Sequence, residues 1–258
     1  DNQGLNGIEM KYDEQLKGKS GRLLIEYDNQ NNEIPQALQE FIPAEAGYDL
    51  HLTIDETIQY IVEREISKVY LEQEAKGVYC VMMDVKTGGI LAMANMPNFD
   101  PNNYSAVDSS VWNNFAVSGM YEPGSTFKIL TAAAALDAGV TTPEDGFYCS
   151  AKITVDGDTI RCWGSPHKDE TMPEALQNSC NPVFVELALR LGTERMYQYL
   201  HAFGLGSKTN VDLQGEGSGI LIPVQSVKNV DLARIGFGQS VAVTPIQLIT
   251  AACAVING

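Results

Sequence analysis

Two stretches of the chain carry apolar residues at helical spacing. In residues 126–138 these residues are Ile129, Ala132, Ala133 and Leu136, and Gly139 stands where a helix would stop. In the other stretch, Thr53 and Glu56 have the spacing of a capping box. The apolar stripe that follows comprises Ile58, Ile61, Val62, Ile66 and Val69. We therefore expect two helices. The helix that follows Thr53 should contribute its apolar stripe to a core.

Two apolar runs with strand character, residues 78–85 and 90–96, are separated by Gly88-Gly89. This pattern predicts a long β-hairpin over residues 77–96. Most of the remaining periodic segments are helical, and residues 141–170 are expected to be rich in loops. Because a two-stranded sheet is marginal in water by itself, we expect further strands to complete it, and hence a longer protein.

Composition excludes some classes of protein. The chain has 258 residues, of which 44% are apolar, so it can bury a sizeable core. No apolar run approaches the ~18 residues of a membrane helix, and the polar N-terminus is not a signal peptide. The net charge of -16 argues against binding to nucleic acid, which depends on neutralising phosphates.

A candidate nucleophile lies just before the helix expected over residues 126–138. Ser125 follows a Pro-Gly turn, and Lys128 comes three residues later, so both side chains share one helix face. A serine hydroxyl becomes nucleophilic when a neighbouring base takes its proton, and burial lowers the pKa of a lysine enough for that role. The alternative is that Ser125 is only an N-cap and Lys128 a surface cation.

A second motif favours the catalytic interpretation. The tripeptide Ser179-Cys180-Asn181 stands before the apolar residues 183–191, with Pro182 at the start of the expected helix. A hydroxyl and a carboxamide two residues apart on a turn can both enter one cleft. The first would relay a proton, and the second would hold a substrate amide. The two motifs together are much rarer by chance than either alone.

With these motifs the chain resembles the penicillin-binding protein and serine β-lactamase superfamily. Residues 49–60, 77–97 and 236–247 are similar to segments of class B penicillin-binding proteins, especially Gram-positive ones of the stage V sporulation protein D type. The resemblance implies an α+β transpeptidase fold, with an antiparallel sheet flanked by helices. It also implies that residues 1–47 end a pedestal or linker module and that residues 48–258 form the transpeptidase domain.

One motif of the family is missing. A Lys-Thr-Gly strand should follow residues 236–258, so we expect the fold to be incomplete at the C-terminus and the chain alone to be inactive. A literal Lys86-Thr87-Gly88 exists, but it falls in the turn of the predicted hairpin. The segment Lys208-Thr209-Asn210 lacks the glycine and is rejected as well.

The resemblance implies a peptidoglycan D,D-transpeptidase that is acylated at Ser125 and is a target of β-lactams. Lys128 would be the base, Ser179 the proton relay and Asn181 the residue that orients the peptide. The implied setting is the extracytoplasmic face of the cell membrane, with an N-terminal anchor outside this chain and a glycan polymerase as partner. A serine β-lactamase, a β-lactam sensor and a scaffold without activity remain alternatives.

A group of metal-binding residue types surrounds the second motif. Cys149, Cys162 and His167 fall close together in the sequence, and Cys180 lies inside the motif. Three thiols and an imidazole suit a tetrahedral structural zinc ion, for which Asp169 could replace one ligand. The alternatives are free thiols, or a disulfide between Cys149 and Cys162 across a short hairpin around residues 155–158. The other two cysteines, Cys80 and Cys253, lie in apolar segments and are expected to be buried outside the site.

Overall fold

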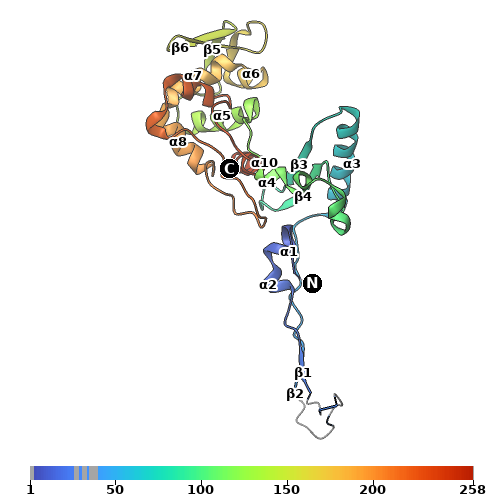
Figure 1. Ribbon diagram of the computed structural model, residues 1–258. Helices are drawn as coiled ribbons and strands as arrows, with labels where there is room; N and C mark the ends of the chain where they lie inside the picture. Colours follow the sequence, from blue (N-terminus) through green and yellow to red (C-terminus); the bar gives the residue numbers. More distant parts are fainter. Residues whose placement is uncertain (1–2, 26–28, 31–33, 35–39, 258) are drawn as a thin grey trace. The chain divides into compact units, whose positions relative to one another are not determined.

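The computed structural model describes residues 3–25, 29–30, 34 and 40–257. The chain divides into two compact units, one of residues 1–52 with 212–214 and one of residues 53–211 with 215–258 (Figure 1). In the described part of the chain, no helix is both long and apolar enough to cross a membrane.

The first unit contains two short helices and a two-stranded antiparallel ribbon. The helices are α1 (Gly7–Lys11) and α2 (Asp13–Leu16), and the strands are β1 (Arg22–Leu24) and β2 (Glu40–Ile42). Beyond the ribbon, Lys19 and Glu45 form a β-bridge, and their side chains form an ion pair of 2.7 Å. Every residue of the two strands is exposed, so this ribbon contributes nothing to a core.

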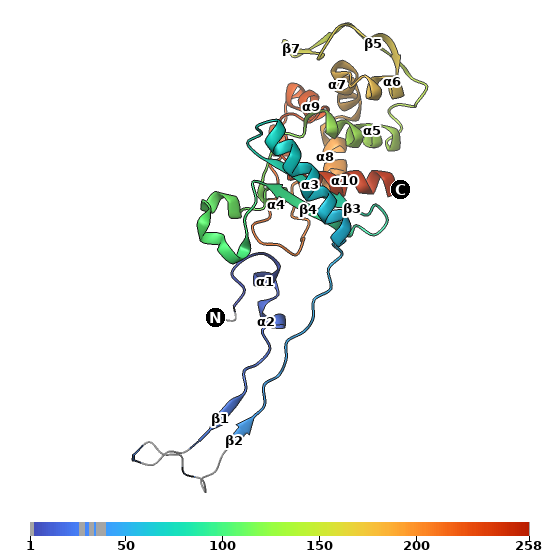
Figure 2. The same ribbon diagram turned by 90° about the vertical axis from the view of Figure 1, so that its right-hand side faces the viewer.

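The second unit begins with the predicted helix and hairpin. Helix α3 (Glu56–Glu72) lies along one face of the antiparallel pair β3 (Val78–Met83) and β4 (Ile90–Met96) (Figure 2). The hairpin prediction is therefore confirmed. Lys86 and Thr87 lie in its turn, where both backbone N–H groups donate to the Asp84 carboxylate. The literal Lys-Thr-Gly is thus a turn sequence, as expected.

Two details of the α3 prediction are wrong. The N-cap is Asp55, whose carboxylate accepts from the Ile58 N–H, while the Thr53 hydroxyl donates to the Ile90 carbonyl instead of capping the helix. The buried face is also narrower than the apolar stripe. Val62 and Ile66 pack on Ala92 and Ala94 of the hairpin, whereas Ile61 and Val69 remain exposed. A hairpin of only two strands covers a narrow face of a helix.

A larger core lies among the remaining helices of the second unit. The α-helices are α4 (Phe115–Ser118), α5 (Lys128–Asp137), α6 (Met172–Gln177), α7 (Asn181–Leu191), α8 (Thr193–Ala202), α9 (Asn229–Ile235) and α10 (Pro245–Asn257). Short 3₁₀ turns are η1 (Pro101–Ala106), η2 (Ser109–Trp112), η3 (Gly124–Phe127) and η4 (Val224–Ser226). Helix α7 lies at the centre, in contact with α5, α8 and α9, and most of its residues are buried.

The region expected to be rich in loops contains four short strands. The strand β5 (Gly146–Cys149) pairs with β8 (Lys168–Thr171), and β6 (Lys152–Val155) pairs with β7 (Asp158–Arg161), both antiparallel. The turn Asp156-Gly157 has positive φ at both residues, which suits a two-residue hairpin. The short hairpin expected around residues 155–158 is therefore present as β6 and β7. The strands β5 and β8 were not expected, because strands of four residues show too few alternations for periodicity to reveal them.

Candidate active site

The candidate nucleophile lies on a tight 3₁₀ turn immediately before α5. This turn, η3, starts at Gly124, whose φ of 57° suits glycine, and the α-helix proper begins at Lys128. The Ser125 side chain is exposed, whereas Lys128 is only 1% exposed. Their Oγ and Nζ atoms are 3.2 Å apart, so the predicted meeting of the two side chains is confirmed.

The Lys128 amine is the centre of the site. Besides Ser125, it donates to the Ser179 carbonyl at 2.7 Å, the Ser179 hydroxyl at 2.9 Å and the Asn181 Oδ1 at 2.7 Å. Its Nζ also lies 5.4 Å from the centroid of the Phe184 ring, a cation–π distance. The four residues predicted from the two motifs therefore share one set of hydrogen bonds.

Burial lowers the pKa of Lys128 to about 8. Removing an ammonium from water disfavours its charged form, so the neutral amine is accessible near physiological pH. A neutral amine has a lone pair and two N–H groups. It can accept the Ser125 proton while still donating to acceptors from the second motif.

The second motif adopts a strained turn between α6 and α7. Ser179 has a φ of 52°, a value that non-glycine residues seldom adopt, and Asn181 is the first residue of α7. The Asn181 side chain is held from both sides, because its Nδ2 also donates to the Arg161 carbonyl at 3.0 Å. One N–H and one lone pair of this amide remain for a substrate.

The glycine-rich turn that follows α9 contacts the turn that carries Ser125. The Gly124 N–H donates to the Gly238 carbonyl at 2.9 Å, and a Cβ on Gly238 would lie 2.2 Å from the Gly124 carbonyl oxygen. The Glu122 carboxylate accepts from the Ser240 N–H at 2.8 Å. The contact of Gly238 with the Ser125 turn was missed from the sequence, where the closely spaced glycines Gly236 and Gly238 are the signal of a turn.

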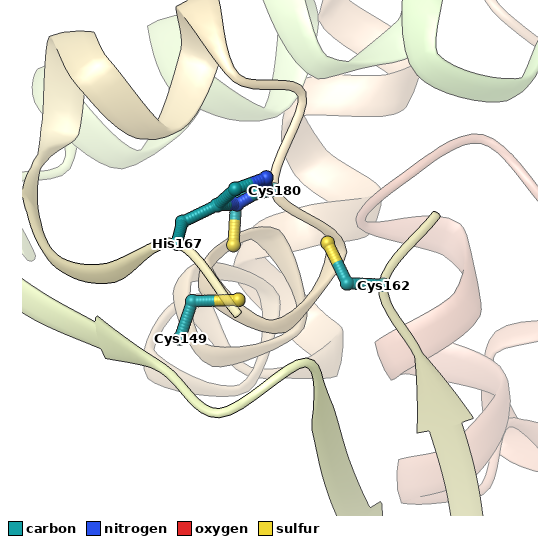
Figure 3. A group of neighbouring side chains, drawn as sticks. All are labelled: Cys149, Cys162, His167 and Cys180. Atoms are coloured by element: carbon teal, nitrogen blue, oxygen red, sulfur yellow. The ribbon is translucent and has the colours of Figure 1, made fainter. Parts of the chain in front are cut away.

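The predicted metal ligands are also brought together. One donor atom from each of Cys149, Cys162, His167 and Cys180 lies within 4.8 Å of the others, although they come from four separate segments. Figure 3 shows the three sulfur atoms and the imidazole around a common centre. All three thiols are free, so the alternative Cys149–Cys162 disulfide is not formed in this structure.

The neighbouring carboxylate in this cluster is Glu170 and not Asp169. Residues alternate sides along β8, so Asp169 is exposed and Glu170 is 5% exposed. The Glu170 Oε2 lies 3.8 Å from His167 Nδ1 and accepts from Asn178 at 3.2 Å. Glu170 Oε1 and His167 Nδ1 are buried without a hydrogen-bond partner among the described residues. The substitution of Asp169 for a ligand is therefore not supported.

The thiol at the centre of the second motif is held in its neutral form. Burial, followed by a hydrogen bond with the Glu170 carboxyl group, raises the pKa of Cys180. A bound cation would reverse this effect, because metal coordination deprotonates a thiol. The donor set and the two buried atoms without partners fit a divalent cation.

The chain matches two protein families over consecutive segments. Residues 78–258 match the penicillin binding protein transpeptidase domain, and residues 1–52 match the penicillin-binding protein dimerisation domain. Among curated relatives, stage V sporulation protein D of Bacillus subtilis is 46% identical over 100% of this chain and 40% of its own length. Peptidoglycan D,D-transpeptidase FtsI of Escherichia coli is 32% identical over 96% of this chain and 42% of its own length.

Solved structures agree with these matches. Penicillin binding protein 3 of Mycobacterium tuberculosis, complexed with ampicillin, superposes with a TM-score of 0.85 at 29% identity, over 99% of this chain and 53% of that one. A peptidoglycan synthetase from Bifidobacterium adolescentis gives a TM-score of 0.87 at 28% identity, over 99% and 46%. The chain thus spans about two fifths of the length of the curated relatives named above. Since the matches run through both units, the chain belongs to the class B penicillin-binding proteins, of the stage V sporulation protein D type.

Proposed function

We propose that the chain carries the nucleophile and its base for a peptidoglycan D,D-transpeptidase, which cross-links stem peptides through a serine acyl-enzyme. The observation that carries this proposal is the buried Lys128 amine, within hydrogen-bond distance of Ser125, Ser179 and Asn181. Relatives named as peptidoglycan D,D-transpeptidases and penicillin-binding proteins support it.

In the first half-reaction, Ser125 attacks the carbonyl carbon between the two terminal D-alanines of a stem peptide. Lys128 accepts the hydroxyl proton as the Oγ–C bond forms. The C–N bond then breaks, and Ser179 donates a proton to the departing D-alanine amine, recovering one from Lys128 at 2.9 Å. The product is an acyl-enzyme on Ser125.

In the second half-reaction, an amine from a neighbouring stem attacks the acyl carbon, so that the cross-linking C–N bond forms and the Oγ–C bond breaks. The amine loses one proton to Ser179 or Lys128, and Lys128 returns a proton to the Ser125 oxygen. The remaining N–H and lone pair of Asn181 are available to orient the peptide backbone. The Ser125 N–H contributes one donor to the oxyanion. β-Lactams present a strained amide in the same geometry and would acylate the same hydroxyl.

The wider setting is part of the same proposal. Residues 1–47 would end a pedestal module and residues 48–258 would form the transpeptidase domain; the compact units divide near Leu52, and one family match covers residues 1–52. The enzyme would work at the extracytoplasmic face of the cell membrane, with a glycan polymerase as partner. The similarity to solved structures described as peptidoglycan glycosyltransferases is consistent with that partner.

A labelled penicillin tests the reaction class. We expect the complete gene product to gain the mass of one penicillin, and peptide mapping to place the adduct on Ser125. The adduct should decay slowly, because a transpeptidase deacylates through an amine acceptor and not through an activated water. Fast turnover of penicillin would instead indicate a β-lactamase, and failure to form any adduct would indicate a scaffold without activity.

We further propose that Cys149, Cys162, His167 and Cys180 hold a structural zinc ion. Four protein ligands leave no open position for catalysis, so the ion would brace the turn that carries Ser179 and Asn181. Two buried polar atoms without partners, on His167 and Glu170, support the proposal, because a nearby dication would compensate them.

Removing zinc is expected to lower the melting temperature by about 10 °C, since binding of a structural zinc ion contributes to folding. Elemental analysis should find one zinc per chain, and Cys149→Ala should abolish it. The matched control is Cys253→Ala, which removes a buried thiol outside the cluster.

Thiol titration of the unfolded protein separates zinc binding from a disulfide, because a disulfide would leave two fewer reactive groups than the 5 cysteines. Absence of zinc together with unchanged melting after chelation would refute the proposal.

A further inference from the structure

The hairpin β6–β7 presents two cations side by side on its outer face. Lys152 and Arg161 are directly opposite each other in the antiparallel register, and both side chains are exposed. Thr154 and Thr159 form the next pair on the same face, with their hydroxyl oxygens 3.4 Å apart. The opposite face packs on the core through Ile153, Val155 and Ile160. Strand alternation therefore separates an apolar face from a basic one.

These cations have no acidic partner within the described residues. In the part of the chain that the structure describes, the side chains of Lys152 and Arg161 form no ion pair and no hydrogen bond; only their backbone carbonyls accept, from the side chains of Ser150 and Asn181. The acidic residues at the far end of the hairpin point to α9 instead, where Asp158 pairs with Arg234 at 3.1 Å. The whole chain has 33 acidic and 17 basic residues. Like charges directly opposite across strands are destabilising, and an anion bound between Lys152 and Arg161 would relieve this repulsion.

The basic pair is attached to the candidate active site by hydrogen bonds. The Arg161 carbonyl accepts from the Asn181 amide at 3.0 Å, and the Trp163 indole donates to the Asn178 carbonyl at 2.8 Å. Both contacts join the base of the hairpin to the turn that carries Ser179. Arg161, and Trp163 with a ring that is 72% exposed, therefore lie next to the turn whose Asn181 is proposed to orient the peptide backbone.

We propose that Lys152 and Arg161 bind a carboxylate of the stem peptide, outside its reacting D-alanyl-D-alanine end. This inference rests on the proposed transpeptidase function and names a specificity determinant for it. The guanidinium group suits a carboxylate because its planar fork can donate two parallel hydrogen bonds. Lys152 adds a second charge opposite it. The hairpin thus selects stem peptides that carry a free carboxylate over those in which the same group is a carboxamide.

The test compares two synthetic stem peptides, one with the free carboxylate and one with the carboxamide, as acyl donors to the complete gene product. Each acylation rate is divided by the rate with labelled penicillin, which reports whether the variant has an intact nucleophile. In the wild type, the carboxylate peptide should react faster. In the double variant Lys152→Gln with Arg161→Gln, this preference should fall about tenfold, as expected for the loss of charge-assisted hydrogen bonds.

The matched control replaces a Lys and an Arg elsewhere on the surface. Arg64→Gln with Lys68→Gln removes the same two charges from α3, and the preference should stay at its wild-type value. An unchanged preference in the hairpin variant, or an equal fall in the control, overturns the inference. If the wild type forms no adduct with penicillin or with either peptide, the proposed transpeptidase function itself is contradicted, and this inference falls with it.

Discussion

Replacing Lys128 with methionine is expected to lower the rate of penicillin acylation at Ser125 by roughly 10² to 10⁴, the range of a general base. Methionine keeps an unbranched apolar stem in the site but has no basic atom to accept the hydroxyl proton. The folded protein should not be destabilised much, because Lys128 is 1% exposed and burial of its ammonium is unfavourable. The acylation rate is measured by intact mass after quenching the reaction at set times, and stability is measured by thermal melting.

The pH dependence distinguishes a base from a packing residue. With a pKa of about 8, Lys128 is mostly protonated at pH 7 and becomes neutral as the pH rises. The wild-type acylation rate should therefore increase about tenfold per pH unit up to about pH 7, more gradually near pH 8, and level off above it. The methionine variant should lose this rise. If the methionine variant keeps both the wild-type rate and the wild-type pH profile, Lys128 is not the base. The Ser125→Ala variant lacks the nucleophile and gives the background rate of the assay.

Replacing Gly238 with alanine should damage both stability and acylation, although Gly238 carries no reactive group. Its φ of 79° is unfavourable for alanine, and the new Cβ would lie 2.2 Å from the Gly124 carbonyl oxygen and 2.7 Å from the Phe127 Cβ. Both neighbours belong to the turn that holds Ser125. Since backbone must move to remove this overlap, we expect the free energy of unfolding to fall by roughly 2–4 kcal/mol. Displacement of Ser125 from Lys128 should slow acylation in parallel.

Gly139→Ala is the matched control for this substitution. Gly139 also has positive φ, 64°, but a Cβ there would have no heavy atom within 4 Å. It should therefore lose only the conformational part, about 1 kcal/mol, and keep the wild-type acylation rate. Denaturant unfolding and labelled penicillin measure the two quantities. Equal losses in both variants would contradict a positioning role for Gly238, because only the φ penalty would then matter.

The sequence predicted those parts of the site that depend on local geometry. Ser125 and Lys128 are one turn apart, so helix geometry alone brings their side chains together. The hairpin of residues 77–96 was equally readable, because its apolar runs are long and a Gly-Gly turn separates them. The second motif was recognised through its residue types, and its proximity to Lys128 was an expectation that the hydrogen bonds confirm.

Other features depend on which surfaces pack against each other. In α5, Leu130, Thr131 and Ala134 are buried, whereas Ile129 and Leu136 of the expected stripe are 40% and 39% exposed. An alanine-rich helix has small side chains on every face, so composition does not decide which face α7 covers. The same limit explains why the sequence suggested Asp169 near the thiols while strand alternation places Glu170 there.

Residue types and their spacing already indicate the chemistry available to this protein: a hydroxyl with an amine one turn away, a Ser-x-Asn turn, and three thiols with an imidazole. How these groups are held depends on packing between distant segments. The Asn181 amide bonds to the Arg161 carbonyl, Gly238 touches Gly124, and the basic pair of the β6–β7 hairpin stands next to the second motif. Such contacts join residues far apart in the chain through backbone atoms. Because every residue has the same backbone groups, residue identity alone does not reveal these contacts.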